Sequence, residues 1–285
     1  MHHTCQQRLA NHPCFNVEAS ASWGRIHLPV APNCNLQCNF CNRKYDCVNE
    51  NRPGVTQQVY TPTEAMAVLD QLFKQRSDIS VVGIAGPGDP LCEPKNTLAT
   101  LQAVHERYPD LMLCVSTNGL NLPHNVDALV NAGVTHVTVT VNAVDAAVGK
   151  NMYAYIRYNQ QVYTGEEAAN ILIRCQDEGI RGLKEHGLIV KINTVVVPGV
   201  NMDHVPAIAK KAAAWGADLM NCMTLIPVAD TAFAHLRPPT PEEIHGLREI
   251  CGAYVPQMRH CGRCRADAVG LLNQTTTTKD ITSPS

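Results

Sequence analysis

The sequence predicts an α/β protein in which six strand-and-helix units form a parallel sheet curled into a partial (β/α)6, TIM-like barrel. First, strand-like and helix-like segments alternate along most of the chain. Second, 285 residues with 45% hydrophobic and 17% charged residues suit one large globular domain. Third, alternate residues of several predicted strands are polar, which indicates that one face of the sheet lines a polar interior.

Each predicted strand is a short apolar segment, and each is followed by a segment with helical periodicity. The strands are expected at 25–31, 79–85, 111–116, 134–142, 188–197 and 217–225. The helices are expected at 61–75, 94–108, 123–133, 165–179, 203–215 and 241–255. The first helix has the clearest start, because Thr61 can cap it, Pro62 suits its first turn and Glu64 completes a capping box. This order favours parallel strands joined by helical crossovers.

One domain is expected over residues 1–270, with an N-terminal extension (1–22), a barrel (about 23–256) and a cysteine-bearing C-terminal segment (257–270). Residues 271–285 are of low complexity and are predicted to form a disordered tail. The N-terminus has no apolar run typical of a signal peptide, and no later stretch reaches the ~20 apolar residues of a membrane helix. A net charge of −2 gives no basic field for nucleic acid. We expect a cytoplasmic monomer without a membrane or nucleic-acid partner.

Strand parity separates the residues that face the helices from those that face the lumen of the barrel. In 134–142, Val137, Val139 and Val141 suit the apolar face that packs on the helices. The residues that parity sends into the lumen are Arg25, His27, Cys114, Ser116, Thr138, Thr140, Asn142, Lys191 and Asn193. Such a polar lumen is expected to be a reaction chamber.

Cys34, Cys38 and Cys41 follow the first strand with the spacing C-x3-C-x2-C, and Phe40 precedes the last of them. An odd total of thirteen cysteines without an export signal points to metal binding and not to disulfides. Three thiolates can hold three irons of a [4Fe–4S] cluster and leave the fourth iron open. The alternative is a zinc site that pairs Cys38 and Cys41 with the C-x2-C at 261–264.

The cysteine spacing resembles the motif of the radical S-adenosylmethionine (SAM) superfamily. The resemblance implies that SAM binds the open iron and is cleaved on reduction to a 5′-deoxyadenosyl radical. The turn GPGDP (86–90) ends the second strand, where ligands bind in parallel α/β folds. The residues that the resemblance and the lumen position make candidate SAM contacts are Gly86, Gly88, Ser116, Thr140, Asn142 and Asn193.

Four longer motifs resemble the NifB family of nitrogenase-cofactor maturases. They are HPC (12–14), CNRKYDCVNENRPGV (41–55), GPGDPL (86–91) and CGRCRADAVG (261–270). The resemblance covers about residues 12–270. The NifX-like domain often fused to that family is absent from the sequence, so the resemblance implies a stand-alone core.

The resemblance implies three [4Fe–4S] clusters, one that generates the radical and two that are substrates. The implied ligands are Cys34, Cys38 and Cys41 for the first cluster, Cys14, His27 and Cys114 for the second, and Cys47, Cys261 and Cys264 for the third. Parity places His27 and Cys114 in the lumen independently of the resemblance. Glu50, Arg52 and Lys191 are candidates for guiding protons or neutralising anionic clusters. The cysteines without an assigned role are Cys5, Cys92, Cys175, Cys222 and Cys251.

By this resemblance the protein fuses two [4Fe–4S] clusters, with insertion of a SAM-derived carbide and an extra sulfur, into the eight-iron precursor of nitrogenase cofactor. A cluster donor and a downstream carrier or scaffold protein are the expected partners. One alternative is another radical SAM maturase with auxiliary clusters, similar to the molybdenum-cofactor maturases. The other is a non-catalytic zinc-binding protein.

Overall fold

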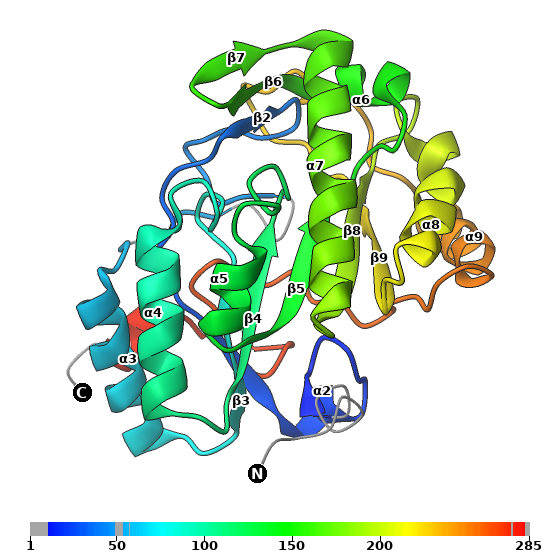
Figure 1. The fold of residues 1–285 in the computed structure, drawn as a ribbon. Coiled ribbons are helices and arrows are strands. Elements are labelled where there is room, and N and C mark those ends of the chain that lie inside the picture. Colours follow the sequence, from blue (N-terminus) through cyan, green and yellow to red (C-terminus); the bar gives the residue numbers. More distant parts are fainter. Residues whose placement is uncertain (1–10, 49–53, 57, 275, 283–285) are drawn as a thin grey trace.

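The partial barrel predicted from the sequence is confirmed (Figure 1). The computed structural model describes residues 11–48, 54–56, 58–274 and 276–282. The parallel strands are β1 (Gly24–His27), β3 (Ile79–Ile84), β4 (Met112–Thr117), β5 (Val134–Thr140), β8 (Ile189–Val196) and β9 (Leu219–Thr224). The sheet order is β10-β1-β3-β4-β5-β8-β9, in which β10 (Val269–Gly270) pairs antiparallel with β1.

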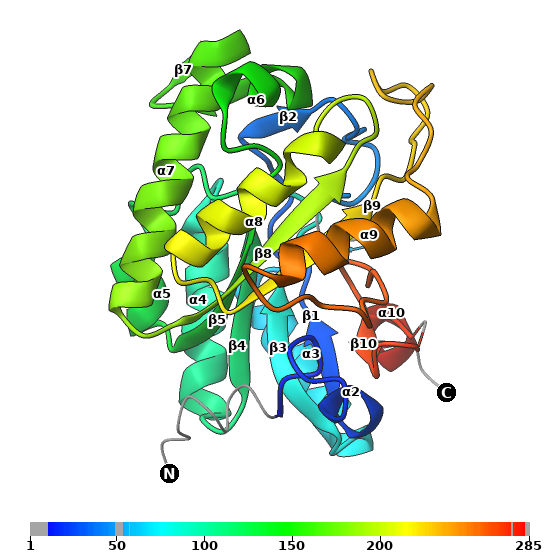
Figure 2. The same cartoon turned by 90° about the vertical axis from the view of Figure 1, so that its right-hand side faces the viewer.

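Helices cover the outer face of this sheet, and α8 and α9 lie over β8 and β9 (Figure 2). They are α3 (Pro62–Gln75), α4 (Pro94–Arg107), α5 (Val126–Asn131), α7 (Gly165–Glu185), α8 (Val205–Ala214) and α9 (Pro241–Gly252), whereas α6 (Ala146–Met152) packs against α7. The shorter helices are α2 (Ala19–Ser22), η1 (Met202–His204) and α10 (Thr278–Thr282). The capping box between Thr61 and Glu64 is present, so the predicted start of α3 is confirmed.

The core lies between the sheet and the helices, and it confirms the predicted parity. Val137, Val139 and Val141 are fully buried in the apolar cluster that also contains the inner faces of α3, α4 and α8. On the opposite face of the same sheet, Thr138 and Lys191 line an internal cavity. The barrel therefore has an apolar outside and a polar inside.

Two features of the barrel's carboxyl end were not predicted. The strand expected over 25–31 ends as β1 at His27, since Pro29 has no N–H to donate to a ladder. A second sheet of three strands, in the order β2-β6-β7, stands above the ends of β4 and β5 in Figure 1. Its strands are β2 (Leu36–Cys38), β6 (Tyr153–Tyr158) and β7 (Gln161–Tyr163).

Residues 271–285 were predicted to form a disordered tail, and this is wrong for the part of the tail that the structure describes. Residues 278–282 form α10, which packs against α3 and lies beside β10 in Figure 2. Ile281 is buried in the main core, and the Tyr60 hydroxyl donates to Thr278 Oγ1 at 3.2 Å. One buried apolar side chain is enough to dock this polar segment. Among the helices in the described ranges, none is long and apolar enough to cross a membrane.

Candidate functional site

Cys34, Cys38 and Cys41 lie close together in the sequence around β2, with Cys34 before this strand, Cys38 at its end and Cys41 in the turn after it; residues 34–47 are called the cysteine loop. The amide of Cys41 donates to the carbonyl oxygen of Cys38 at 3.0 Å. Gln37 Nε2 donates to the carbonyl oxygens of Cys38 (3.1 Å) and Cys41 (2.6 Å). The Phe40 ring is buried, 6.2 Å from the ring of Phe233, and anchors the loop in an apolar cluster. The three thiols are thus held together by the backbone that carries them.

Cys38 and Cys41 are buried and Cys34 is partly buried, and Arg43 lies near Cys34 and Cys41. Burial, with Asp89 nearby, raises the pKa of Cys34 to about 12. Burial also raises the pKa of Cys41, and Arg43 opposes that rise through its charge and a hydrogen bond. Iron is bound by thiolates, so loading a cluster here must release protons, and Arg43 partly compensates the negative charge that remains.

The GPGDP turn is bound to the cysteine loop by backbone contacts. Gly88 N donates to Ala31 O at 2.6 Å, and Asp89 N donates to Asn33 O at 2.7 Å. A Cβ added at Gly88 would stand 2.1 Å from Asn33 O, so only glycine permits this approach. Cys47 N donates to Pro87 O at 2.9 Å. The turn therefore fixes both the cysteine loop and Cys47.

A small pocket at the carboxyl ends of the strands joins Cys34 to three of the predicted SAM contacts. Cys34, Cys47, Gly88, Ser116 and Thr140 line it, together with Asp89, Thr117 and Asn118. Their role in binding SAM stays a prediction.

The other predicted SAM contacts lie elsewhere. Asn142 is buried and its Oδ1 accepts from Val195 N at 2.9 Å, so it joins β5 to the end of β8. Asn193 lines the inner cavity of the lumen. Gly86 accepts at its carbonyl oxygen from Ala31 N at 3.3 Å, which makes it part of the backbone contact between the two loops. The sequence pattern alone does not separate such bracing residues from ligand contacts.

The lumen contains an inner cavity in which four distant parts of the sequence meet. Five of the six residues predicted to bind the substrate clusters line it: Cys14, His27, Cys114, Cys261 and Cys264. They come from the N-terminal extension, β1, β4 and the C-terminal segment. Ser116 lines both this cavity and the pocket beside Cys34, so the two spaces adjoin.

Cys47, the sixth of these residues, lines the pocket of Cys34 instead. Its neighbour Val48 accepts at the carbonyl oxygen from Arg263 Nη2 at 2.9 Å, and Arg263 Nη1 donates to Thr224 O at 2.6 Å. Arg263 therefore ties the chain after Cys47 to the turn between Cys261 and Cys264. The grouping of these three cysteines on one cluster stays a prediction.

The His27 ring is arranged as a metal ligand. Its Nδ1 lies 2.9 Å from Arg265 O, and because a carbonyl only accepts, Nδ1 carries the proton and Nε2 keeps its lone pair. Burial, with Arg25 next in effect, lowers the pKa of His27 to about 3, so the ring is neutral. Gly83 on β3 leaves space for the ring, since a Cβ there would lie 3.0 Å from His27 Cδ2.

The inner cavity has a positive potential. Arg25 is fully buried and donates from Nη2 to Cys264 Sγ at 3.0 Å, from Nη1 to Leu271 O at 2.9 Å, and to Gly270 O. Lys191 Nζ lies 5.8 Å from the centroid of the Phe15 ring. Of the described residues that line the cavity, none is Asp or Glu. Two buried cations without a lining carboxylate favour an anionic occupant.

Of the three charged residues predicted to act near the clusters, Lys191 is the one that the structure describes, and it lines the inner cavity. Glu50 and Arg52, and likewise Cys5, lie outside the described residues. Cys175, Cys222 and Cys251 are buried, and Cys222 lies within hydrogen-bond distance of Cys251.

Sequence reasoning missed two histidines of the inner cavity region. The His12 ring lies 4.4 Å from the His136 ring and 4.9 Å from the Phe15 ring, and His12 lines the cavity. The parity of β5 could have found His136, which stands two residues before Thr138. His12 lies in the extension, where no strand periodicity applies, although the HPC motif includes it.

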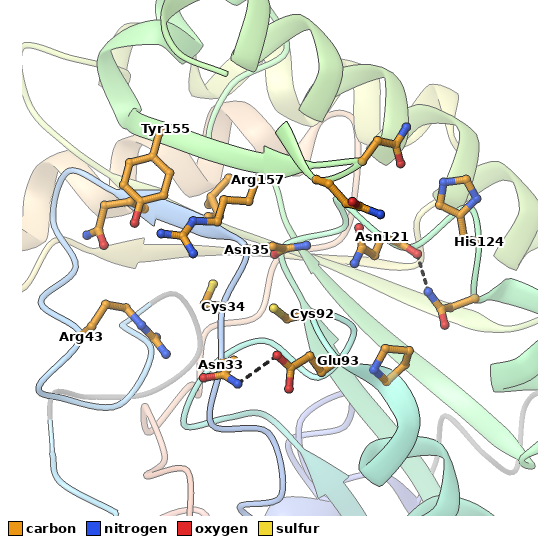
Figure 3. Close-up of a pocket in the computed structure, with 16 residues that line it drawn as sticks. Asn33, Cys34, Asn35, Arg43, Cys92, Glu93, Asn121, His124, Tyr155 and Arg157 are labelled. Carbon is orange, nitrogen blue, oxygen red and sulfur yellow. Dashed lines mark hydrogen bonds between the residues drawn. The ribbon is translucent and has the colours of Figure 1, made fainter. Parts of the chain in front are cut away.

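The outer side of the cysteine loop opens into a polar cleft of about 860 Å³ (Figure 3). Cys34 and Cys92 both line it, with Arg43 and Arg157 from the cysteine loop and β6. Asn33 Nδ2 donates to Glu93 Oε1 across its floor at 3.1 Å. Cys34 thus lies between the small pocket at the carboxyl ends of the strands and a cleft that is open to the surface.

Within the described ranges, no three His, Cys, Asp or Glu side chains gather closely enough to hold one metal ion. The zinc site considered from the sequence is not supported, since Cys38 and Cys41 pack in an apolar cluster while Cys261 and Cys264 line the inner cavity. In an iron–sulfur cluster each thiolate binds a different iron, so the ligands stand further apart. Thiolates are the usual ligands of iron–sulfur clusters, so the donor atoms of the cysteine loop and of the inner cavity suit such a group.

Comparison with known proteins places these features in a family. Residues 28–212 match the radical SAM superfamily. The FeMo cofactor biosynthesis protein NifB of Chlorobaculum tepidum is 46% identical over 266 residues, which are 93% of this chain and 63% of that protein. NifB of Klebsiella pneumoniae is 46% identical over 94% of this chain and 58% of its own length. The chain thus spans little more than half the length of such relatives.

Two solved structures show the same fold. Methylornithine synthase (PylB) aligns with a TM-score of 0.53 at 15% identity, over 98% of this chain and 87% of its own. The structure of anSMEcpe with bound AdoMet aligns with a TM-score of 0.53 at 13% identity, over 82% of this chain and 60% of its own. At these identities the likeness concerns the fold alone.

Proposed function

The chain belongs to the radical SAM superfamily, and from this premise we propose that it is a nitrogenase-cofactor maturase of the NifB type. It fuses two [4Fe–4S] substrate clusters, with a carbide derived from the methyl group of SAM and one added sulfur, into an eight-iron precursor. A cluster donor delivers the substrates and a carrier or scaffold protein receives the product. The sequence similarity to NifB proteins over 93–94% of the chain supports this choice among radical SAM activities.

The observation that carries the proposal is the composition of the inner cavity. Its thiols and imidazole come from four distant segments, and two buried cations accompany them without a lining carboxylate. A cavity that bound a neutral organic substrate would not need such a set of iron ligands. Burial raises the pKa of Cys14 to about 11, so cluster loading must displace its proton, and Arg25 and Lys191 lower the energy of the resulting anion.

The proposed roles belong to two adjoining spaces, the small pocket beside Cys34 and the inner cavity. Cys34, Cys38 and Cys41 would hold the radical-generating cluster, which when bound to SAM supplies the electron that cleaves it to a 5′-deoxyadenosyl radical. The buried Asp89, which accepts from Asn118 N at 2.6 Å and Thr117 Oγ1 at 3.0 Å, shapes the pocket beside Cys34. Ser116 lies where this pocket meets the inner cavity, so the reacting carbon has a short path to the substrate clusters.

The substrate clusters need to be held and then released. His27 presents a neutral Nε2 as an iron ligand, oriented by Arg265 O. A neutral imidazole gives less charge to iron than a thiolate does, which makes it the weaker ligand of its set. This suits a cluster that must leave its ligands and merge with another.

The test uses the anaerobically reconstituted full chain, a reductant, an added inorganic sulfur source and SAM labelled with carbon-14 in its methyl group. We expect S-adenosylhomocysteine, 5′-deoxyadenosine and label that stays with an extractable iron-containing product. Cys114→Ala is the matched control, because it removes a ligand of the inner cavity and leaves the cysteine loop intact. Formation of 5′-deoxyadenosine with no label in the iron fraction would contradict the proposal and favour another radical SAM maturase.

A further inference from the structure

The two histidines that line the inner cavity, His12 and His27, have opposite hydrogen-bond arrangements. At His27, Nδ1 faces a carbonyl oxygen, that of Arg265, at 2.9 Å. At His12, Nδ1 faces an amide, that of Cys14, at 3.1 Å. The first ring must donate from Nδ1 and the second must accept at Nδ1.

These contacts fix what each ring presents at its other nitrogen. An Nδ1 that accepts from a backbone N–H has its lone pair in that bond, so the single ring proton of His12 is on Nε2. His12 therefore presents an N–H group, whereas His27 presents a lone pair. Of the two, only His27 is arranged to bind iron, and His12 is arranged to donate a hydrogen bond.

The Nε2 of His12 is buried and has no hydrogen-bond partner among the described residues. The side chain is 1% exposed and lines the cavity beside Cys14. The rings of Phe15, in an edge contact at 75°, and His136 pack against it, which keeps the imidazole from turning away. A buried donor without a partner lowers stability, so a group that enters the cavity as an acceptor recovers this energy.

We propose that His12 donates a hydrogen bond from Nε2 to a sulfur atom of the substrate cluster bound at Cys14, His27 and Cys114. The inference rests on the proposed function, since it takes the substrate cluster as the occupant of this cavity. An N–H···S bond withdraws electron density from the cluster and stabilises its reduced form, which raises its reduction potential. His12 is thus a residue that contacts and tunes the substrate without binding iron.

Two amide substitutions separate the two nitrogens of the ring. In His12→Asn, Oδ1 takes the place of Nδ1 and can accept from Cys14 N, but the donor at Nε2 is lost. In His12→Gln, the amide nitrogen takes the place of Nε2 and keeps the donor, while the acceptor for Cys14 is lost. The pair therefore distinguishes hydrogen bonding to the cluster from support of the turn at residues 12–14.

The measurement is pulsed EPR and an EPR-monitored redox titration of the full chain loaded with clusters and free of SAM. Nitrogen hyperfine coupling from His27 identifies the cluster of interest. We expect, in addition to the coupling of the His27 Nδ1–H, a further exchangeable proton coupling on this cluster in the unmodified chain, lost in deuterium oxide. His12→Asn should lose the coupling and lower the potential of the cluster, and His12→Gln should keep both.

Equal shifts in the two variants, or no further exchangeable proton on a nitrogen-coordinated cluster of the unmodified chain, would overturn the inference while leaving the proposed function intact. An unmodified chain that carries only the cluster of Cys34, Cys38 and Cys41, without nitrogen coupling, would overturn the proposed function as well. The His27 Nδ1–H is also exchangeable, so the coupling assigned to His12 is the one that differs between the unmodified chain and His12→Asn; if His12→Asn does not fold, a changed coupling in His12→Gln would overturn the inference.

Discussion

At the scale of single residues, Gly83 is important because it has no side chain that would displace the ring of His27, the proposed iron ligand that it faces. We predict that Gly83→Ala lowers the loading of the histidine-coordinated cluster several-fold, because the new Cβ would stand 3.0 Å from His27 Cδ2 and displace the ring. The measurement is the nitrogen hyperfine signal per iron. Gly246→Ala is the control, since a Cβ there would meet no described atom within 4 Å. Unchanged loading in Gly83→Ala would show that the ring position is not critical.

The positions of single residues were predicted correctly where the residues lie on a regular strand, because alternate residues of a strand face the same side. Parity placed His27, Cys114 and Lys191 in the lumen, and all three line the inner cavity, because each lies on a regular strand. Parity also pointed Asn142 inward, but it stands beyond the last residue of β5 and braces the end of β8. His12 was not assigned a role, because its position depends on tertiary contacts of an extension without regular structure.

At the scale of elements, the contact between the GPGDP turn and the cysteine loop shapes the proposed radical-generating site. We predict that Gly88→Ala abolishes reductive SAM cleavage and leaves the His27-coordinated cluster in place. The cause is a clash with the carbonyl oxygen of Asn33, 2.1 Å from the added Cβ, which a backbone atom cannot relieve by rotation. The checks are 5′-deoxyadenosine formation and iron content. The control is Gly252→Ala, where the nearest atom would be 3.9 Å away.

A full rate of SAM cleavage in Gly88→Ala would mean that the two loops can separate without loss of function.

The unexpected docking of α10 gives a prediction about stability. Ile281→Ala should lower the free energy of unfolding by about 2 kcal/mol, at the low end for a buried isoleucine because this helix lies at the edge of the core. Denaturant unfolding of the reduced chain measures it. Lys279→Ala, on the exposed side of the same helix, should change the stability by less than about 0.5 kcal/mol. Equal values for the two variants would argue that α10 does not contribute to the fold.

The elements were predictable to the extent that each has its own local pattern. The strands and helices of the barrel follow apolar periodicity and caps, such as Thr61 with Glu64, and they were found within about four residues of their ends, except that α7 runs to Glu185, beyond the predicted end at 179. The sheet β2-β6-β7 was not found, because β2 and β7 have three residues each and are defined by their pairing with β6. The prediction for the tail was wrong because its composition is polar, and Ile281, the buried apolar residue of α10, gives no periodic signal.

At the scale of the whole molecule, the fold brings together segments that are more than two hundred residues apart. Cys14 and Cys264 line one cavity because β10 pairs with β1 and the C-terminal segment returns along the first strand. Composition and periodicity cannot predict such a convergence. The resemblance to the NifB family grouped these residues, and the cavity places five of them together.

Cys47 provides a test of this long-range organisation. It lies in the pocket of Cys34, yet it is predicted to share a cluster with Cys261 and Cys264, and Arg263 connects the two segments. The double variant Cys47→Ala/Cys264→Ala should lose the same amount of iron as either single variant, since each change removes the same cluster. Iron analysis under anaerobic conditions measures this. Additive losses would mean that Cys47 belongs to another cluster.

The proposed function divides the barrel into a radical-generating site and a separate substrate cavity, in two spaces that both include Ser116. The direct measurement is the iron content and EPR spectrum of Cys34→Ala beside Cys114→Ala, each reconstituted in the same way. We predict that Cys34→Ala loses SAM cleavage and one cluster but keeps the nitrogen-coordinated signal. Cys114→Ala should lose that signal and keep SAM cleavage. Loss of nearly all iron, or of the same signal, in both variants would contradict the account.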